Sequence, residues 1–405
     1  MRPSVIFILA TVMTDAMGVG LILPVMPDLL HEVRGGTLAG AALWGGVLTT
    51  VFAVMQFFFG PVVGGLSDRF GRRPVLLISL AALAIDFLVM AVAGSIWILL
   101  AGRVFGGIFA ATTPTAGAYM ADISKGEDRA ANFGLIGAAF GAGFVIGPLI
   151  GGLLGEYGTR APFYAAAMLC TATFILGCFT LRETLTVQSR RKFSWRRANP
   201  FGSLLQLNRV PGLGALLWVY FLFQIAFMVY PAIWAYYGKA RFDWDPAMIG
   251  VSLATYGVTI ALVQGLLIRP VIRLMGQRGA VIFGHVVETL SFVALGVITD
   301  GNLALAIIVA ASLAAVLTPA IQGMMSDAVS ADAQGELQGS LTSLMALAMI
   351  LSPLVMTGVF AWFTRPGVTP YLPGAPFLLS ALLMIAALII FLRSTPGRSL
   401  ADDAA

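Results

Sequence analysis

The sequence predicts an all-α integral membrane protein, with twelve transmembrane helices arranged as two pseudo-symmetric halves of six. Of its 405 residues, 59% are hydrophobic and 11% are charged, whereas a soluble domain has about 45–50% apolar and about 25% charged residues. The apolar residues come in blocks of about 20, enough for a helix to cross about 30 Å of hydrocarbon. The two halves of the chain also share a repeat. This composition excludes an ordinary soluble enzyme, a disordered protein and a nucleic-acid-binding protein.

Twelve apolar segments, separated by glycines, prolines and charged residues, are expected to cross the membrane. The expected spans are 4–28, 39–66, 74–94, 96–120, 132–155, 162–181, 212–237, 248–268, 279–298, 302–324, 339–363 and 374–393. The first segment lacks a small-residue cleavage site and contains Asp15. We therefore expect a retained helix there rather than the alternative, a removable signal peptide.

Seven identities between the two halves occur at a fixed offset of 205 residues. The matched pairs are Gly71 and Gly276, Arg73 and Arg278, Pro114 and Pro319, Met120 and Met325, Asp122 and Asp327, Gly134 and Gly339, and Pro148 and Pro353. Parallel repeats are typical of transporters whose halves alternately expose a substrate site near the bilayer midplane. The expected domains are an N-terminal six-helix half over 1–181, a cytoplasmic basic linker over 182–211, a C-terminal six-helix half over 212–393 and a cytoplasmic tail over 394–405.

Lysine and arginine are unevenly distributed between the two sides of the predicted bundle. With the N-terminus inside, eighteen of the 24 lie in cytoplasmic segments, five lie on the opposite side and one, Arg103, lies within a span. The five on the opposite side are Arg34, Arg160, Lys239, Arg241 and Arg365. The positive-inside rule therefore predicts that both termini are cytoplasmic.

Four ionisable residues lie inside predicted spans: Asp15 in the first, Asp86 in the third, Arg103 in the fourth and Glu288 in the ninth. A charge in hydrocarbon is costly, so these residues are candidate functional groups. Burial favours the neutral form of a carboxyl group, which allows the three acids to bind a proton on one side of the membrane and release it on the other. Arg103 cannot titrate, but it can hold a carboxylate in its charged form. The alternatives are a static ion pair between Asp86 and Arg103, and cation binding by the acids.

Uncharged polar residues in the spans are candidates for a substrate cavity. They are Gln56, Gln224, Gln264 and Gln322. Amides can hydrogen-bond a polyoxygenated substrate, and they serve equally well to join neighbouring helices. The seventh span is rich in aromatic residues, which we expect to form part of an interfacial belt, with one or two lining the cavity.

The loop between the second and third spans reads Gly-Gly-Leu-Ser-Asp-Arg-Phe-Gly-Arg-Arg-Pro from Gly64 to Pro74. Gly71 permits a tight turn, and Asp68 can form a charged lock with the arginines at neighbouring helix ends. Positive charge alone would be only a topology signal, but this spacing resembles the conserved loop of the major facilitator superfamily, which gates the cytoplasmic side. The resemblance implies that fold, and it implies gate roles for Gly64, Asp68, Arg69, Gly71, Arg72 and Arg73. The second-half copy is reduced to Gly276-Gln277-Arg278.

The fifth span carries a glycine motif of six residues in the order Gly-x8-Gly-x3-Gly-Pro-x2-Gly-Gly. Its members are Gly134, Gly143, Gly147, Pro148, Gly151 and Gly152. Physically, the motif predicts a kinked helix with a smooth face that a neighbouring helix can approach closely. It also resembles the antiporter motif of drug/proton exporters in the superfamily, which favours efflux.

Within the superfamily, the sequence resembles the tetracycline/proton antiporters at Thr14–Pro27, at Ser67–Leu77, at Ile85-Asp86 and at Gly102-Arg103. The likeness continues through Arg182-Glu183-Thr184 to Gln338-Gly339-Ser340. The resemblance implies intramembrane charges needed for exchange at Asp15, Asp86 and Arg103, gate residues at Asp68, Arg72 and Asp122, and cavity residues at Gln56 and Gln264.

Two positions depart from that family. Glu288 stands where the family has a ninth-span aspartate, and Ile260, which cannot carry a proton, stands where it has an eighth-span histidine. His285 lies one turn before Glu288 on the same predicted helix face and is an alternative titrating group. The other histidine, His31, falls in a predicted loop.

The resemblance implies a transporter rather than an enzyme: a proton-driven exporter of tetracycline-like amphipathic drugs in the bacterial cytoplasmic membrane. We expect no resident cofactor and no dedicated metal site, because a magnesium ion would arrive chelated by the drug. The expected partners are protons, a small-molecule substrate and the lipid bilayer, with no nucleic acid and a functional monomer. The alternatives are other cargo, including a soft metal ion bound by Met13 and Met17 or by Met345 and Met349, and a transport-dead sensor.

Overall fold

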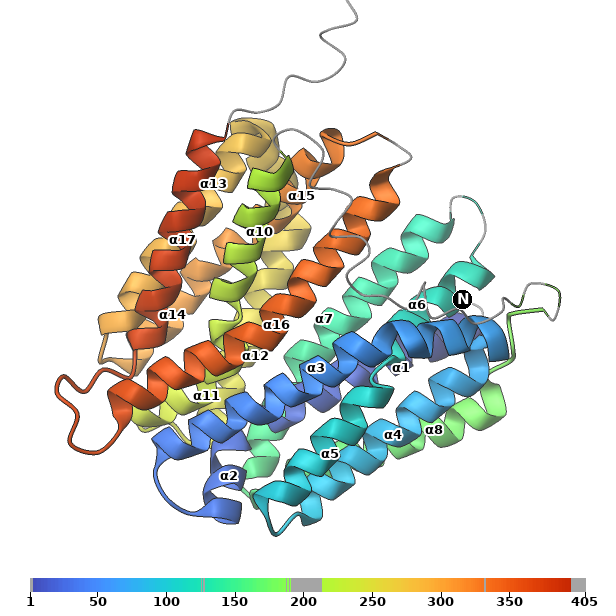
Figure 1. Cartoon of the computed structure of the whole chain (residues 1–405), viewed down its shortest axis with the longest axis horizontal. Helices are drawn as coiled ribbons and strands as arrows, with labels where there is room; N and C mark the ends of the chain where they lie inside the picture. Colours follow the sequence, from blue (N-terminus) through green and yellow to red (C-terminus); the bar gives the residue numbers. More distant parts are fainter. Residues whose placement is uncertain are drawn as a thin grey trace, which may run out of the picture. The chain divides into compact units, whose positions relative to one another are not determined.

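The computed structural model describes residues 3–124, 126, 128–186, 188, 190, 213–330 and 333–394. Most of the predicted linker, 182–211, lies outside these residues, as does the predicted tail, 394–405, apart from Ser394. Arg2 and Lys125, two of the predicted cytoplasmic charges, also lie outside them. The described residues form helices joined by short connections, and they contain no strand (Figure 1). The all-α prediction is confirmed.

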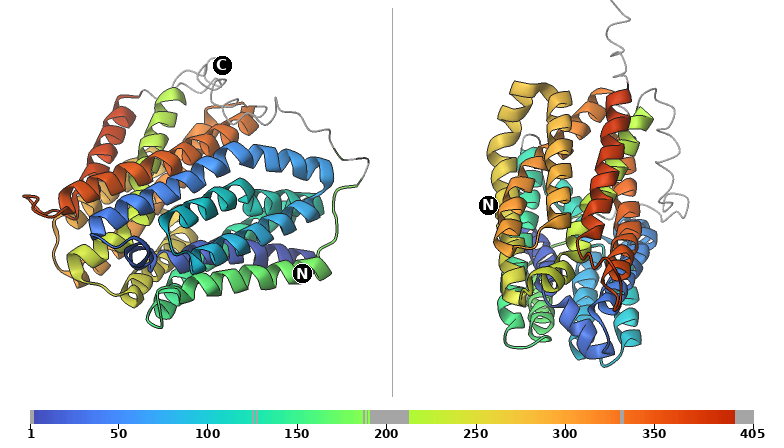
Figure 2. Two further views of the ribbon diagram at one scale, coloured as in Figure 1. Left: turned by 60° about the horizontal axis from the view of Figure 1, so that its bottom comes forward. Right: turned by 90° about the vertical axis from the view of Figure 1, so that its left-hand side faces the viewer.

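The chain divides into two compact units, which we describe separately. Unit 1 contains the first eight helices together with Trp244–Gly257. Its helices are α1 (Pro3–Ile22), α2 (Met26–Arg34), α3 (Leu38–Phe70), α4 (Arg72–Val92), α5 (Ile96–Phe109), α6 (Thr112–Ile123), α7 (Asp128–Gly155) and α8 (Ala161–Thr180). Helix α4 packs between α5 and α8 (Figures 1 and 2). Helix α1 packs against α7.

Unit 2 contains the remaining described residues, up to Asp243 and from Val258 onward. Its helices are α10 (Leu213–Phe227), α11 (Val229–Phe242), the second part of α12 (Pro246–Leu262), the π-helical turn η2 (Val263–Leu267), α13 (Ile268–Val297), α14 (Gly301–Ala311), the 3-10 segment η3 (Ser312–Val316), α15 (Leu317–Asp327), α16 (Gln334–Thr364) and α17 (Ala375–Arg393). Helix α17 packs against both α10 and α13 (Figure 1). The Ser380 hydroxyl, on α17, donates a 3.1 Å hydrogen bond to the Ala226 carbonyl of α10.

Each of the twelve predicted spans overlaps helices among the described residues, but the first, 4–28, was wrong at its end. Helix α1 stops at Ile22, a turn follows, and His31, which was expected in a loop, lies on α2. Eleven helical runs among the described residues are long and apolar enough to cross a membrane. The longest, Pro246–Val297, has 52 residues and contains the predicted spans 248–268 and 279–298. Its direction changes at Gly276, whose φ of 68° lies outside the helical region. The two spans therefore follow each other across a tight turn that only glycine adopts easily.

Two predicted spans, 96–120 and 302–324, contain breaks at the repeated prolines. Helix α5 ends at Phe109 and α6 begins at Thr112, two residues before Pro114. Proline has no N–H group, so the carbonyl of Ala110, four residues earlier, loses its helical partner. The side-chain amide of Gln56 donates to that carbonyl at 3.2 Å. In unit 2 the 3-10 segment η3 ends at Val316, three residues before Pro319.

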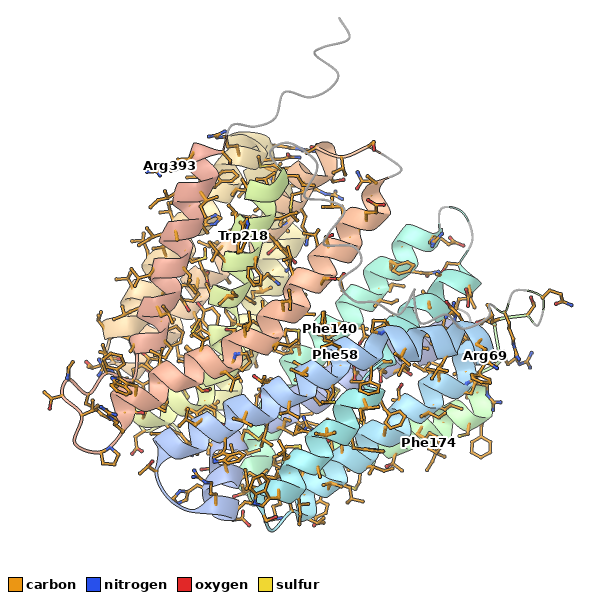
Figure 3. The ribbon with its side chains drawn as sticks, in the orientation of Figure 1. Phe58, Arg69, Phe140, Phe174, Trp218 and Arg393 are labelled. Carbon is orange, nitrogen blue, oxygen red and sulfur yellow. The ribbon has the colours of Figure 1, made fainter. Side chains whose placement is uncertain are left out.

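Large apolar side chains cover much of the outer surface, as expected for helices in contact with lipid. Trp218 on α10 is 60% exposed and Phe58 on α3 is 50% exposed, and both are labelled in Figure 3. Inside each unit, the buried positions are filled with leucine, alanine and aromatic residues. Buried charges are therefore exceptions to this pattern, and they define the candidate site.

Candidate functional site

Asp86 and Arg103 form a buried ion pair between α4 and α5. Asp86 is fully buried and Arg103 is 8% exposed, and a guanidinium nitrogen contacts the carboxylate Oδ2 directly. The Arg103 guanidinium also lies over the Phe52 ring, 4.9 Å from its centroid. Asp86 Oδ1 and Arg103 Nε have no hydrogen-bond partner among the described residues. The Asp86–Arg103 ion pair, which the sequence analysis gave as an alternative, is therefore formed. Each partner keeps one atom that can still form a hydrogen bond.

Two glycines on α5 make room for this ion pair. A methyl group added at Gly106 would lie 2.6 Å from the Asp86 carboxyl carbon, and one at Gly102 would lie 3.2 Å from Asp86 Oδ1. Real Cβ atoms do not approach other atoms to 2.6 Å, so Gly106 allows α5 to pass directly over the carboxylate. Sequence reasoning did not assign a role to Gly106.

Asp15 lies on α1 and faces the start of α6. The Thr113 hydroxyl donates a 2.8 Å hydrogen bond to Asp15 Oδ2. One residue earlier, Thr14 shares a 3.0 Å hydrogen bond with Thr173 of α8. Asp15 itself is partly exposed, and no cation of the described residues lies within ion-pair distance of it. This acid therefore has a neutral partner and some access, unlike Asp86.

Glu288 is the buried acid of unit 2. It lies on α13, is 1% exposed, and interacts with the Tyr230 hydroxyl of α11. The Tyr230 ring packs against Phe292 and Phe377, with centroids 5.5 and 5.9 Å away. Glu288 Oε1 has no hydrogen-bond partner, and no cation lies within 4.0 Å of the carboxyl group, among the described residues. An ionised carboxylate in such surroundings would be uncompensated.

Three of the predicted gate residues, Asp68, Arg72 and Asp122, form a polar network at the junction of α3 and α4. Arg72 Nη1 contacts Asp68 Oδ1 at 2.6 Å, Arg72 Nε contacts Asp122 Oδ2 at 3.2 Å, and Nη1 also donates to Ser67 Oγ at 3.1 Å. Asp122 lies near the end of α6, so the network joins three helices. Arg73 points elsewhere and donates to the Cys178 carbonyl at 2.8 Å.

Two of the predicted gate residues take no part in this network. The Arg69 guanidinium lies over the neighbouring Phe70 ring, 5.0 Å from its centroid, at the exposed end of α3 (Figure 3). A methyl group added at Gly64 would meet no atom within 4 Å, so close packing does not require a glycine there.

Glu183, which sequence reasoning quoted but did not assign a role, completes the network. Its carboxylate accepts from the backbone N–H groups of Arg72 and Arg73, at 2.9 and 3.2 Å. It also accepts from the N–H groups of Thr184 and Leu185, both at 3.0 Å. The carboxylate therefore caps the first turn of α4, where the helix dipole favours a negative charge. Gly71 has a φ of 111°, and a side chain there would collide with the Glu183 carboxylate.

The glycine motif of α7 packs against α1, as its small residues predict. Methyl groups added at Gly143, Gly147 and Gly151 would collide with the α1 backbone at Met13, Met17 and Leu21 respectively.

The remaining members of the motif have other surroundings. Gly152 instead faces Pro246 and Gly250, within unit 1, and Gly134 meets nothing within 4 Å. A methyl group added at Gly20 of α1 would lie 2.6 Å from the Pro148 ring. Gly134 is thus the one glycine of the motif that packing among the described residues does not explain.

The four glutamines are divided between the units. Gln56, in unit 1, donates to the Ala110 carbonyl that Pro114 leaves unpaired. In unit 2, Gln224 is buried on α10, Gln264 is exposed in η2, and Gln322 of α15 interacts with the Tyr220 hydroxyl. Gln56 therefore has a structural contact that spacing could not reveal.

The comparisons with known proteins agree with this arrangement. A profile for the Major Facilitator Superfamily matches residues 8–239, more than half of the chain. The chain belongs to the major facilitator superfamily. It is 43% identical to the tetracycline resistance protein of class C from Escherichia coli, over 88% of this chain and 90% of that protein. It is 41% identical to the class G protein from Vibrio anguillarum, over 89% and 91%.

A solved structure supports the same fold. The crystal structure of a nucleoside transporter matches with a TM-score of 0.75, over 97% of this chain and 98% of that one, at 13% identity. The superfamily fold predicted from the gate loop is confirmed, and so is the resemblance to the tetracycline proteins. As a superfamily member, the chain is a multi-pass membrane transporter of small molecules and not an enzyme.

Proposed function

We propose that this chain is a proton-coupled antiporter that exports tetracycline-like amphipathic drugs by alternating access. The observation that carries the proposal is the 43% identity to a tetracycline resistance protein over about nine-tenths of both chains. The buried acids of both units support proton coupling. A transporter that exchanges a drug for protons needs groups that are protonated in one conformation and deprotonated in the other.

The surroundings of the acids suggest different roles for each. Arg103 compensates Asp86, so this carboxylate stays charged and the pair remains nearly neutral as a unit. Asp15 and Glu288 have only hydroxyl partners among the described residues, from Thr113 and Tyr230. We assign proton binding and release to these two acids, because each becomes uncompensated when it loses its proton. The charge lost or gained there biases the equilibrium between the two transport states.

The substrate site is proposed to use amide side chains and to need no resident cofactor. A tetracycline would arrive as its magnesium chelate, and Gln224, Gln264 and Gln322 offer hydrogen bonds to its oxygens. The described residues contain no group of three or more His, Cys, Asp or Glu that could hold a metal ion. The proposed partners are the chelated drug, protons and the surrounding lipid, with one chain as the working unit and no nucleic acid.

We place the chain in the bacterial inner membrane with both termini in the cytoplasm. Eighteen lysines and arginines against five support this orientation. These five residues also make local contacts. Arg160 donates to the Ala91 and Ala93 carbonyls at 2.7 and 2.8 Å, and Arg241 donates to the Val297 and Ile298 carbonyls at 2.8 and 2.6 Å. Arg34 and Arg365 lie over Trp44 and Trp362.

The test is tetracycline uptake into everted membrane vesicles with an imposed proton gradient. The wild type should accumulate the drug, and Asp15→Asn and Glu288→Gln should each abolish gradient-driven accumulation. An exposed acid provides the matched control, since Glu156→Gln, in the turn just after α7, should accumulate the drug normally. A well-expressed wild type that accumulates no tetracycline would exclude this substrate and direct the search to other cargo.

A further inference from the structure

Two buried polar atoms without partners lie on the same face of α13. They are His285 Nε2 and Glu288 Oε1, and neither has a hydrogen-bond partner among the described residues. His285 is 0% exposed and Glu288 is 1% exposed. Three residues along a helix correspond to about 4.5 Å of rise and about 60° of rotation, so the two side chains leave the helix as neighbours. Buried polar groups without partners are rare, and two such neighbours require an explanation.

The backbone determines which nitrogen of His285 carries hydrogen. Nδ1 lies 2.9 Å from the Val281 carbonyl oxygen, one turn earlier. A carbonyl can only accept, so Nδ1 is the donor and carries the hydrogen of the neutral ring. Nε2 then has an unshared lone pair facing a buried environment. This is the nitrogen that is able to receive a proton.

The surroundings of the ring leave Glu288 as the group that exchanges a proton with it. Within unit 2, α13 packs against α14, α15, α17, η2 and η3, and against α11 through Tyr230 and Tyr237. The charged residues of these described elements are Lys239, Arg241, Asp327 and Arg393. Arg241, two residues after Lys239, donates to the Val297 and Ile298 carbonyls at the end of α13 away from Arg278. Asp327 accepts a 3.0 Å hydrogen bond from Gln277, and Arg393 is at the last position of α17.

The other groups around His285 and Glu288 are one arginine, two aromatic rings and aliphatic side chains. Phe391 stacks on the His285 ring at 6.3 Å, and the Arg278 guanidinium lies 5.6 Å from the centroid of that same Phe391 ring. On the side of η3 and α15, a methyl group added at Gly284 would meet Ala314 and Leu317, which carry no polar side chain. Tyr230 faces Glu288 from α11.

We propose that His285 is a proton-relay residue that receives the proton of Glu288 and passes it toward the end of α13 that carries Arg278. Oε1 and Nε2 are not hydrogen-bonded to each other in this arrangement, so the Glu288 side chain first rotates toward the ring. The Glu288 O–H bond then breaks and an N–H bond forms at His285 Nε2, which leaves a carboxylate beside an imidazolium. The proton then leaves Nε2 for water when that end of unit 2 opens. The step is a proton transfer, and no group is oxidised or reduced. The inference rests on the proposed proton-coupled transport and adds a residue to it.

The relay predicts that His285 is needed for coupling but not for drug movement. In membrane vesicles, His285→Gln should reduce gradient-driven tetracycline accumulation at least tenfold. The same variant should keep tetracycline exchange without a gradient within twofold of the wild type. His31→Gln is the matched control, because His31 is the other histidine of the chain and lies exposed on α2; it should retain both activities. Normal gradient-driven accumulation in His285→Gln, or loss of both activities, would overturn the relay.

A second measurement separates failure of the relay from failure of the proposed function. Infrared difference spectra of the purified chain, titrated with pH, show the carboxyl band of Glu288, assigned as the band that Glu288→Gln removes. The relay predicts that the pH dependence of this band changes in His285→Gln and not in His31→Gln, because the two groups share one proton. An unchanged band in His285→Gln overturns the relay, whether or not tetracycline is the substrate. An absence of tetracycline accumulation together with a changed band overturns only the substrate.

Discussion

Gln277 donates a 3.0 Å hydrogen bond to Asp327 across 50 residues of sequence. At the offset of 205 residues these positions correspond to Arg72 and Asp122, which form an ion pair at 3.2 Å. Glycine with a positive φ precedes both Arg72 and Gln277. The repeat therefore preserves the contact while its donor changes from a charged to a neutral group. The degenerate copy of the gate loop still hydrogen-bonds the corresponding aspartate, but more weakly, because its donor carries no charge.

Because Asp122 pairs with a charged donor and Asp327 with a neutral one, neutralising the two acids should affect drug export unequally. Asp122→Asn loses an ion pair with Arg72 and a charge-assisted bond from Thr184, and it should slow drug export several-fold. Asp327→Asn retains an amide oxygen that accepts from Gln277, and its export rate should stay within twofold of the wild type. Initial rates of drug export by cells with matched expression measure both. Equal losses in the two variants would contradict the asymmetry.

Glu183 should stabilise the fold through its own hydrogen bonds, independently of the gate arginines. Glu183→Gln removes the negative charge from the first turn of α4 and weakens four hydrogen bonds to backbone N–H groups. The free energy of unfolding should fall by about 0.5–2 kcal/mol, the usual worth of a helix cap. Thermal unfolding in detergent measures the change. Glu156→Gln removes an exposed acid without such contacts and should leave the melting temperature unchanged.

Gly106→Ala should disrupt the ion pair of unit 1. The added methyl group would collide with the Asp86 carboxylate, which is paired with Arg103 and cannot move without leaving it. Overpacking of this kind costs about 1–3 kcal/mol, and we expect transport to fall at least tenfold. Gly137→Ala on α7 adds the same methyl group where nothing lies within 4 Å, and this control should transport normally. Wild-type transport by Gly106→Ala would show that the pair tolerates displacement.

Arg160, on the side predicted to carry few positive charges, should stabilise the fold. Its guanidinium caps the end of α4 through two carbonyls and contacts Glu32 at 2.8 Å. Arg160→Gln should lower the free energy of unfolding by about 1–2 kcal/mol, because charged donors to backbone carbonyls are lost. Arg34→Gln removes the contact with the Trp44 ring and should cost less. Unfolding measurements in detergent compare the stability of the two variants. Equal losses would contradict the role of Arg160 as a cap of α4.

The spans and the buried charges were predictable because each leaves a local signal. About 20 apolar residues identify a span wherever it folds, and an aspartate inside one, such as Asp86, stands out without knowledge of its partner. The prediction of one span over 96–120 agrees with the single apolar run Ile96–Ile123, but the break between α5 and α6 within it was not predicted. The Ala110 carbonyl at this break accepts from Gln56, which lies 54 residues earlier.

The contacts that complete the candidate site were not predictable, because they depend on side chains distant in sequence. Glu183 was noted as part of a similar stretch, yet only the fold brings it 111 residues back to the backbone of Arg72. Tyr230 was one aromatic residue among many in the seventh span. Its contact with Glu288 distinguishes it from the others, and no spacing rule relates two helices that pack at an angle.

The central claim is that drug export and proton movement are one process, and drug-induced proton release tests it most directly. Everted vesicles with an acidified interior and a luminal pH dye receive tetracycline with magnesium. The account predicts that the lumen becomes more alkaline on drug addition with the wild type, and that neither Asp15→Asn nor Glu288→Gln gives this response. Drug accumulation by the wild type without any luminal pH change would contradict the account.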